Sequence, residues 1–218
     1  TGSPLQIGFT RSPHDLFMMH GLLHGLVDQN DLGPVQSYLA EADLLDSRAT
    51  DPSVSLPVTR LNAAAVAGVL DRYAVLSSGA TLGYGIGPLV CRAAGGSENP
   101  SLDSLAGGRV AVPGDAATAA LLLRLFGPRH MELVPTGGER ILAAVATGKV
   151  DAGVVLHAER YSVPADGVDV VADLGELWED ATSLPLPLEV LCVRRDVADS
   201  ICAAVESAVV ASIRTGFD

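Results

Sequence analysis

The sequence predicts an α/β fold of two lobes with a central cleft. Short apolar segments of strand length alternate with segments of helical periodicity along the 218-residue chain. Hydrophobic residues make up 48% and charged residues 18%, which is enough apolar material for a well-buried core. Two extended segments, 88–92 and 184–193, bracket one α/β unit as crossover strands between lobes would. We therefore expect a first lobe at 1–89 plus 190–218 and a second lobe at 90–189.

The N-terminal elements are a strand at 6–9 and a helix at 15–27. Ser12 suits the N-cap of this helix, Pro13 suits its first position, and Asp15 completes a capping-box pattern. The elements expected next are one short helix within 28–57, an Ala-rich helix at 63–73, a strand at 73–76, a glycine-rich segment at 81–87 and an extended segment at 88–92.

The second half of the chain repeats the alternation of strands and helices. Gly148 is expected to close one of these helices as a left-handed C-cap. The last helix carries Ile201, Val205, Val209 and Ile213 on one face. The preceding elements are strands at 109–112, 132–135, 150–156, 169–174 and 189–193, and helices at 116–126, 139–147 and 176–181.

His157 directly follows the expected strand at 150–156. In open α/β sheets ligands bind outside the carboxyl ends of the strands, so we expect His157 to point into the cleft. A neutral imidazole at this place is suited to act as a general base at physiological pH. The alternative is a partly buried histidine at a strand end with no chemical role.

Two turns between a strand and a helix are candidate sites for an anion or a carboxylate, because helix N-termini present free N–H groups. The first turn contains His14 and Asp15, and the second contains Gly114, Ala117 and Thr118. A glycine-rich segment holds Gly85 and Gly87, but a proline and a strand follow it, so a dinucleotide site is not expected. A hinge, or close approach of the backbone to a ligand, fits this segment better.

The composition excludes several classes of partner. The net charge of -12 argues against nucleic acid and against an anionic membrane. No apolar stretch is long enough to span a bilayer, and no secretion signal precedes the first strand, so we expect a cytoplasmic protein. His20 and His24 lie four residues apart but lack a third ligand, so no metal is expected. The three cysteines show no pattern and are expected to be reduced.

Many segments in order resemble the futalosine-pathway menaquinone enzymes, in particular the 1,4-dihydroxy-6-naphthoate synthase family. The sister enzymes that dehydrate chorismate are similar at a greater distance. The resemblance extends over nearly the whole chain and rests on residues 7–9, 12–17, 24–25, 56–61, 71–73, 82–90, 109–114, 139–142, 151–153, 157–160, 173–175, 178–179 and 184–188.

The resemblance implies the two-lobed fold of type-2 periplasmic binding proteins and a cofactor-free lyase. Such an enzyme cleaves cyclic dehypoxanthinyl futalosine and releases 1,4-dihydroxy-6-naphthoate, with His157 in the position of the base. The carboxylate of the substrate would then bind at the helix N-terminus near Thr118 and at Thr59. The substrate-binding residues expected in all are His14, Asp15, Thr59, Arg60, Asn62, Gly85, Gly87, Gly114, Ala117 and Thr118.

Several positions depart from the family pattern. An Asn-Asp-Thr segment of the family reads His14-Asp15-Leu16, a Thr-Lys-Leu-Ser segment reads 59–62 with Arg60 and Asn62, and a threonine pair reads Ala117-Thr118. The chain also stops at Asp218, where relatives continue through further helices, which would leave apolar surface on the first lobe and favour a homo-oligomer.

Three functions therefore stay open. The chain is a naphthoate synthase, an enzyme of the same fold that uses the same base on another cyclic carboxylate, or a ligand-binding protein without activity. Retention of His157 favours the two enzymes. A signal peptide upstream of Thr1 in the gene would favour the binding protein.

Overall fold

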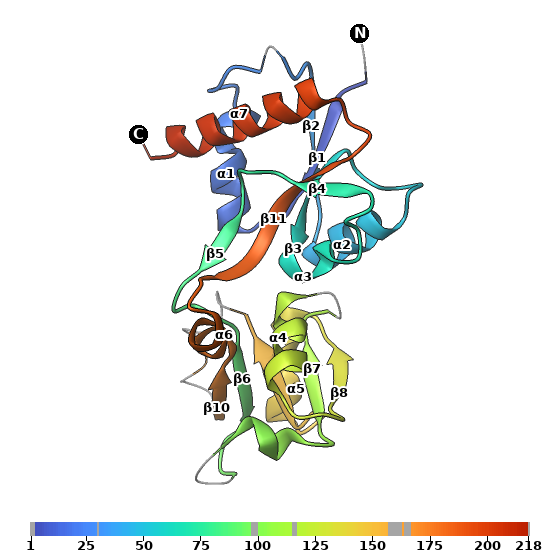
Figure 1. Ribbon diagram of the computed structural model, residues 1–218. Helices are drawn as coiled ribbons and strands as arrows, with labels where there is room; N and C mark the ends of the chain where they lie inside the picture. Colours follow the sequence, from blue (N-terminus) through green and yellow to red (C-terminus); the bar gives the residue numbers. More distant parts are fainter. Residues whose placement is uncertain are drawn as a thin grey trace. The chain divides into compact units, whose positions relative to one another are not determined.

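The computed structural model of the protein describes residues 3–29, 31–96, 100–114, 117–156, 163 and 167–217. The chain divides into two compact units, which are Thr1–Thr81 with Pro187–Asp218, and Leu82–Leu186 (Figure 1). The chain therefore crosses between the units twice, and the lobe boundaries expected from the sequence lie further along the chain at both crossings. The cleft between the lobes stays a prediction.

Unit 1 is built on a mixed sheet with the strand order β2-β1-β3-β11-β4, and β5 pairs with β11 beside this path. β1 is parallel to β2 and to β3, whereas β11 is antiparallel to β3 and to β4. The carboxyl ends of β1 and β3 therefore lie at the same edge of the sheet. The strands are β1 (Leu5–Phe9), β2 (Val35–Leu39), β3 (Val58–Asn62), β4 (Tyr73–Val75), β5 (Thr81–Gly83) and β11 (Leu186–Arg194).

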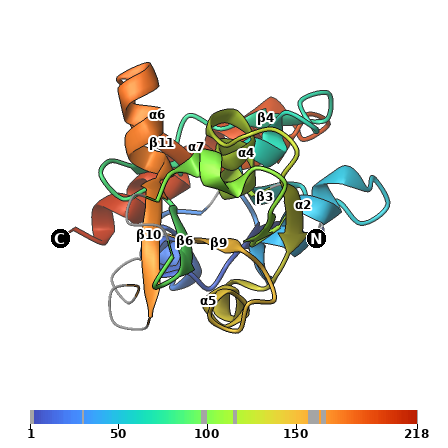
Figure 2. The ribbon, with the colours of Figure 1, turned by 90° about the horizontal axis from the view of Figure 1, so that it is seen from below.

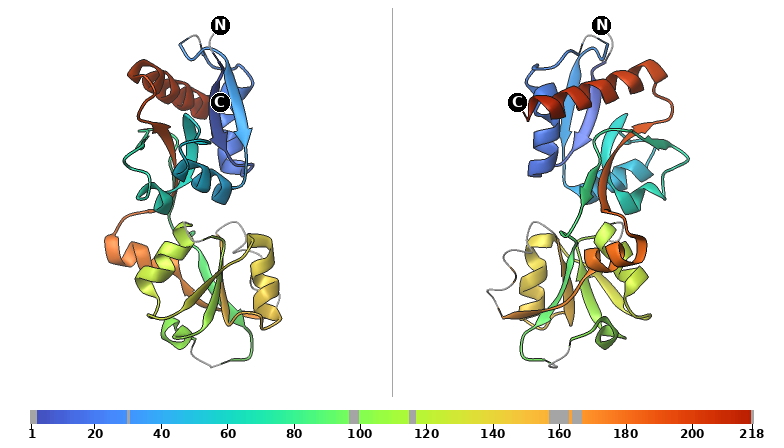
Figure 3. Two further views of the ribbon diagram at one scale, coloured as in Figure 1. Left: turned by 90° about the vertical axis from the view of Figure 1, so that its right-hand side faces the viewer. Right: turned by 60° about the vertical axis from the view of Figure 1, so that its left-hand side comes forward.

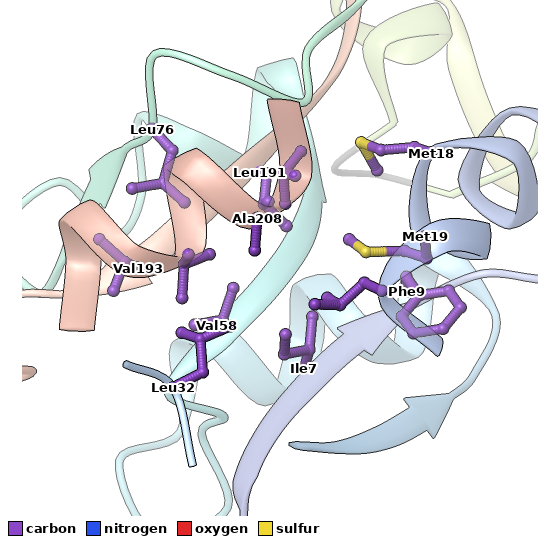
Figure 4. Packing of buried hydrophobic residues seen from close by; sticks show 13 residues of the cluster. Ile7, Phe9, Met18, Met19, Leu32, Val58, Leu76, Leu191, Val193 and Ala208 are labelled. Atoms are coloured by element: carbon purple, nitrogen blue, oxygen red, sulfur yellow. The ribbon is translucent and has the colours of Figure 1, made fainter. Parts of the chain in front are cut away.

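Helices cover both faces of the unit 1 sheet. α1 (Pro13–Leu23) and α7 (Asp199–Thr215) pack on the face to which Val58 points, and Figure 4 shows their side chains meeting those of β1, β3 and β11. Leu61, on the opposite face of β3, packs against Ala49 of α2 (Ala42–Thr50). As the amphipathic pattern predicts, Val205 and Val209 of α7 belong to the first of these two clusters, and Ile201 and Ile213 are partly buried against it.

The start of α1 is as the sequence predicts, and its end is not. The Ser12 hydroxyl accepts a hydrogen bond from the backbone N–H of Asp15 at 3.3 Å, and Pro13 is the first helical residue. The expected helix runs to residue 27, but α1 ends at Leu23 because Gly25 takes a left-handed conformation with φ of 65°.

One further helix expected in unit 1 was wrong in its length, and one strand was missed. The Ala-rich helix expected at 63–73 is only α3 (Ala63–Val66), and the residues after it form tight turns with hydrogen bonds from Gly68 to Ala65 and from Arg72 to Val69. Gly68 weakens the helix at this point, and Tyr73 is buried as the first residue of β4. β2 was not expected at all.

Unit 2 is built on a five-stranded sheet with the order β10-β6-β9-β7-β8. β7 is parallel to β8 and β9, whereas β6 is antiparallel to β9 and β10. In the left view of Figure 3, α4 and α6 cover one face of this sheet and α5 covers the other, and Figure 2 shows the same layers from below. The elements are β6 (Leu89–Ala93), a 3-10 helix (Leu102–Leu105), β7 (Arg109–Val112), α4 (Thr118–Phe126), β8 (Glu132–Pro135), α5 (Gly138–Ala146), β9 (Ala152–Val155), β10 (Val168–Asp173) and α6 (Leu174–Thr182).

Local signals in unit 2 are borne out more often than in unit 1. Gly148 has φ of 67°, as a left-handed C-cap requires.

Within the described residues, no helix combines the length and the apolar character that crossing a membrane would need.

Candidate active site

Five of the predicted site residues lie close together in unit 1. His14 and Asp15 lie in the first turn of α1, which follows β1, and Thr59, Arg60 and Asn62 lie in β3. Because β1 and β3 are parallel, both groups lie at the same edge of the sheet. In open α/β sheets this is the edge where ligands bind.

Arg60 is the centre of this group, and only 2% of its side chain is exposed. Its Nε lies 2.7 Å from Oδ1 of Asp15. The two atoms form an ion pair, but their geometry is not that of a hydrogen bond. Its Nη2 donates to Oε2 of Glu189 and to Oγ1 of Thr81, both at 2.7 Å, and its Nη1 donates to the Gly79 carbonyl. Every nitrogen of the guanidinium therefore has a partner within the protein.

Asp15 connects this ion pair to the end of β1. Its Oδ2 accepts hydrogen bonds from the backbone N–H and from the hydroxyl of Thr10, both at 2.8 Å. The same Thr10 hydroxyl accepts from the backbone N–H of Ser12, at 3.1 Å. The Asp15 carboxylate therefore stabilises the backbone at the point where the chain turns from strand to helix.

Two further carboxylates complete the group, the buried Asp46 and the half-buried Glu189, and neither was among the residues expected from the sequence. Asp46 on α2 accepts hydrogen bonds from the backbone N–H of Asn62 at 3.0 Å and from its side-chain amide at 2.6 Å. Burial raises the pKa of Asp46 to about 6, and burial also raises the pKa of Glu189, against the lowering effect of Arg60. One signal was available for Glu189, since it is a charged residue inside an otherwise apolar strand.

His14 and Thr59 differ in their accessibility. His14 is exposed on the first turn of α1, and its proximity to Glu189 lowers the pKa of that carboxyl group. Thr59 is 1% exposed, and its hydroxyl donates to the carbonyl of Arg60 at 3.1 Å. Thr59 points to the opposite face of β3 from Arg60, since neighbouring residues of a strand alternate. The binding role of both residues stays a prediction.

The other predicted residues gather at one edge of the unit 2 sheet. The parallel strands β7 and β9 pair Ala111 with Gly153, so both strands end at this edge. The antiparallel β6 pairs Leu89 with Val155, which brings the segment before Leu89 to the same edge. Gly87, Gly114 and the end of β9 therefore lie near one another.

The N-terminus of α4 lies at this edge as well. Thr118 is its first residue and is 7% exposed, and Ala117 is its N-cap. An alanine side chain offers no acceptor for the first N–H groups of the helix, unlike Ser, Thr, Asp or Asn. Among the residues of unit 2 that the structure describes, the start of α4 is the most suitable place to bind a carboxylate.

His157, the predicted base, lies outside the described residues. The structure describes the strand before it, since β9 ends at Val155, followed by Leu156. The role of His157 therefore stays a prediction.

Gly85 and Gly87 have local structural reasons to be glycine. Gly85 has φ of 65°, and its N–H donates to Oε1 of Glu179 at 2.8 Å. A Cβ on Gly87 would lie 2.2 Å from the backbone of Gly175. The close approach at Gly87 is thus between two parts of the backbone, and contact of either glycine with a ligand stays a prediction.

His20 and His24 lie side by side on α1, with 4.5 Å between their ring centroids. Within the part of the chain that the structure describes, no three His, Cys, Asp or Glu side chains come together as metal ligands would.

The two α/β units define the periplasmic-binding-protein-like fold, as solved structures show. A protein from Archaeoglobus fulgidus has a TM-score of 0.86 and 32% identity, over 97% of this chain and 76% of that one. The alkanesulfonate-binding protein from Xanthomonas axonopodis pv. citri, bound to MOPS, has a TM-score of 0.69 and 16% identity, over 99% of this chain and 74% of that one. The two-lobed α/β fold expected from the sequence is therefore confirmed.

The sequence comparisons are more specific. A family model described as menaquinone biosynthesis matches residues 5–218, and the chain belongs to this family. A 1,4-dihydroxy-6-naphthoate synthase from Thermus thermophilus is 40% identical, over 96% of this chain and 73% of the relative. A protein of the same name from Streptomyces coelicolor is 34% identical, over 98% of this chain and 74% of the relative. The predicted resemblance is thus confirmed.

Proposed function

We propose that this chain is a lyase of menaquinone biosynthesis that cleaves cyclic dehypoxanthinyl futalosine and releases 1,4-dihydroxy-6-naphthoate. The observation that carries the proposal is the 40% identity to a synthase of that name, over 96% of this chain. An alignment over 96% of the chain extends across both units. The fold by itself would not choose between an enzyme and a binding protein.

The proposed reaction begins with removal of a proton by His157. The substrate carries an acidic proton beside a ketone, and loss of this proton lets electrons move toward an aromatic ring as the carbon–carbon bond to the ribose-derived ring breaks. A base and correct positioning are sufficient for this chemistry, so we propose a reaction without a cofactor. His157 follows β9 by two residues in the sequence, and β9 ends at the carboxyl edge of the unit 2 sheet, which supports the assignment of His157 as the base.

The substrate carboxylate is proposed to bind at the start of α4, near Thr118, and not at Arg60. The helix start offers N–H groups and a positive dipole end, whereas the charge of Arg60 is already balanced by Asp15 and Glu189. Asp46 adds another buried carboxyl group to the unit 1 site. An added anion would be repelled there, so the uncharged hydroxyl groups of a substrate suit unit 1 better.

The test is incubation of the purified protein with cyclic dehypoxanthinyl futalosine, with the naphthoate followed by absorbance and mass. We expect release of 1,4-dihydroxy-6-naphthoate without any added cofactor. A folded protein that binds this substrate but releases no product would overturn the proposal. A different cyclic carboxylate would then be the substrate, as the family departures His14, Arg60 and Asn62 would allow.

Two further expectations belong to this proposal. A biosynthetic enzyme of this kind would act in the cytoplasm on a small molecule, and fractionation of the producing cells tests this location. A homo-oligomer is proposed from the apolar residues exposed on α1, such as Leu16 and Phe17. Light scattering at several protein concentrations measures the mass directly.

A further inference from the structure

Arg60 holds both of the segments at which the chain crosses between its units. Thr81, whose hydroxyl accepts from Nη2 of Arg60, is the last residue of unit 1 before the first crossing. Gly79, whose carbonyl accepts from Nη1, precedes it by two residues. Glu189, whose Oε2 accepts from Nη2, follows the return crossing at Leu186–Pro187. One buried side chain therefore fixes both crossings to unit 1.

α6 fixes the same two segments to unit 2. Oε1 of Glu179 accepts from the backbone N–H of Gly85 at 2.8 Å, a short way past the first crossing. The indole N–H of the neighbouring Trp178 donates to the carbonyl of Pro185 at 3.3 Å, directly before the return crossing. Each crossing thus has one anchor in each unit, made by side chains that belong to that unit.

We propose that Arg60 in unit 1, and Trp178 and Glu179 in unit 2, are positioning residues that confine the hinge to residues 82–84 and 186–188. A rotation of one unit against the other changes backbone dihedral angles, and hinges place such changes in a few residues. Residues held by their own unit cannot take up the rotation without breaking an anchor. The rotation is therefore limited to the two short stretches between anchors. The first of them begins within β5, the second lies at the start of β11, and these two strands pair.

This assignment gives Arg60 a role other than that of substrate ligand. Its guanidinium group forms an ion pair with Asp15 and donates hydrogen bonds to Glu189, Thr81 and the Gly79 carbonyl. A lysine at this position would keep the charge beside the two carboxylates. It would not provide the planar set of donors that reaches both crossings at once.

The test is hydrogen exchange measured by mass spectrometry on the wild-type chain and on Arg60→Lys. We expect the amides of 79–84 and 186–190 to exchange about tenfold faster in the variant, which corresponds to losing one hydrogen bond to a charged group. Exchange in the core of α7 should stay unchanged. The matched control is Arg194→Lys, because Arg194 contacts Asp196 and Ser55, away from both crossings.

Unchanged exchange at both crossings in Arg60→Lys, or an equal increase over the whole of unit 1, would overturn the inference. If Arg60→Lys does not fold, Thr81→Val removes a single anchor and should raise exchange at the first crossing only. Glu179→Ala should release the Gly85 amide from the unit 2 side. These measurements use no substrate, so their failure would leave the proposed reaction untouched, and the inference goes beyond that reaction.

Discussion

Asp15 and Arg60 form a buried ion pair between the first turn of α1 and β3, with 2.7 Å between Oδ1 and Nε. None of the Asp15 side chain and 2% of the Arg60 side chain are exposed. Since burial of a single charge is far more costly than burial of a pair, each residue makes the other tolerable in the core. Two residues expected as substrate ligands are thus part of the framework that shapes the site.

The first prediction concerns this pair. Replacing Asp15 with Ala should lower the free energy of unfolding by about 3–5 kcal/mol, because Arg60 would keep a buried charge with one carboxylate fewer. Urea unfolding followed by circular dichroism measures this change. The control is Glu139→Ala, whose ion pair with Arg140 is mostly exposed and should be worth less than about 1 kcal/mol. Equal losses in the two variants would contradict the account.

The second prediction concerns pH and Asp46. Its pKa is raised from 3.8 to about 6 by burial, so between these values the folded state binds more protons than the unfolded state. Stability from this group is therefore full below about pH 4 and is lost as pH rises toward 6, by an amount on the order of 3 kcal/mol. Asp46→Asn should remove this loss. Urea midpoints from pH 4 to 8 measure it, and parallel curves for the two proteins would contradict the prediction.

The third prediction concerns the contact between Gly87 and Gly175. Gly87→Ala places a Cβ 2.2 Å from backbone atoms of Gly175, which cannot move as a flexible side chain would. We expect unit 2 to lose about 1–3 kcal/mol of stability through overpacking. Gly68→Ala is the control, since its Cβ would meet only Ala65 at 3.5 Å. The midpoints of thermal unfolding of the two variants measure the difference. An unchanged midpoint for Gly87→Ala would contradict the prediction.

The fourth prediction concerns carboxylate binding at α4. Thr118→Val should raise KM about 10-fold or more and leave kcat nearly unchanged, because a hydrogen bond to the charged substrate is lost in the ground state and in the transition state alike. Thr147→Val, at an exposed position after α5, is the control. Steady-state kinetics on the futalosine-derived substrate measure both constants. An unchanged KM would place the carboxylate elsewhere.

Local signals predicted the elements that local chemistry controls. The Ser12 and Pro13 start of α1 and the Gly148 end of α5 rest on capping and on a positive φ, which act within one helical turn. β2 has no buried residue and hence no apolar alternation. The helix at 63–73 was overestimated because its alanines suit a helix, while Gly68 and the burial of Tyr73 favour turns and a strand.

The sequence offered candidate residues for the site, but it could not predict the ion network around Arg60. The rule that ligands bind at the carboxyl ends of strands led to His157, and the free N–H groups of a helix start led to Thr118, and the roles of both stay predictions. The partners of Arg60 come from three distant segments, with Glu189 lying 129 residues away in the sequence. No periodicity relates residues so far apart, so Arg60 was expected as a ligand for substrate rather than as an anchor for the chain crossings.

The most direct test of the proposed reaction compares His157→Ala with the native protein on cyclic dehypoxanthinyl futalosine. We expect turnover to fall by about 100-fold to 10,000-fold, the range that a positioned general base contributes, while thermal stability is kept. His20→Ala, at an exposed position on α1, should retain native turnover. Native turnover in the folded His157→Ala protein would contradict the assignment of His157 as the base.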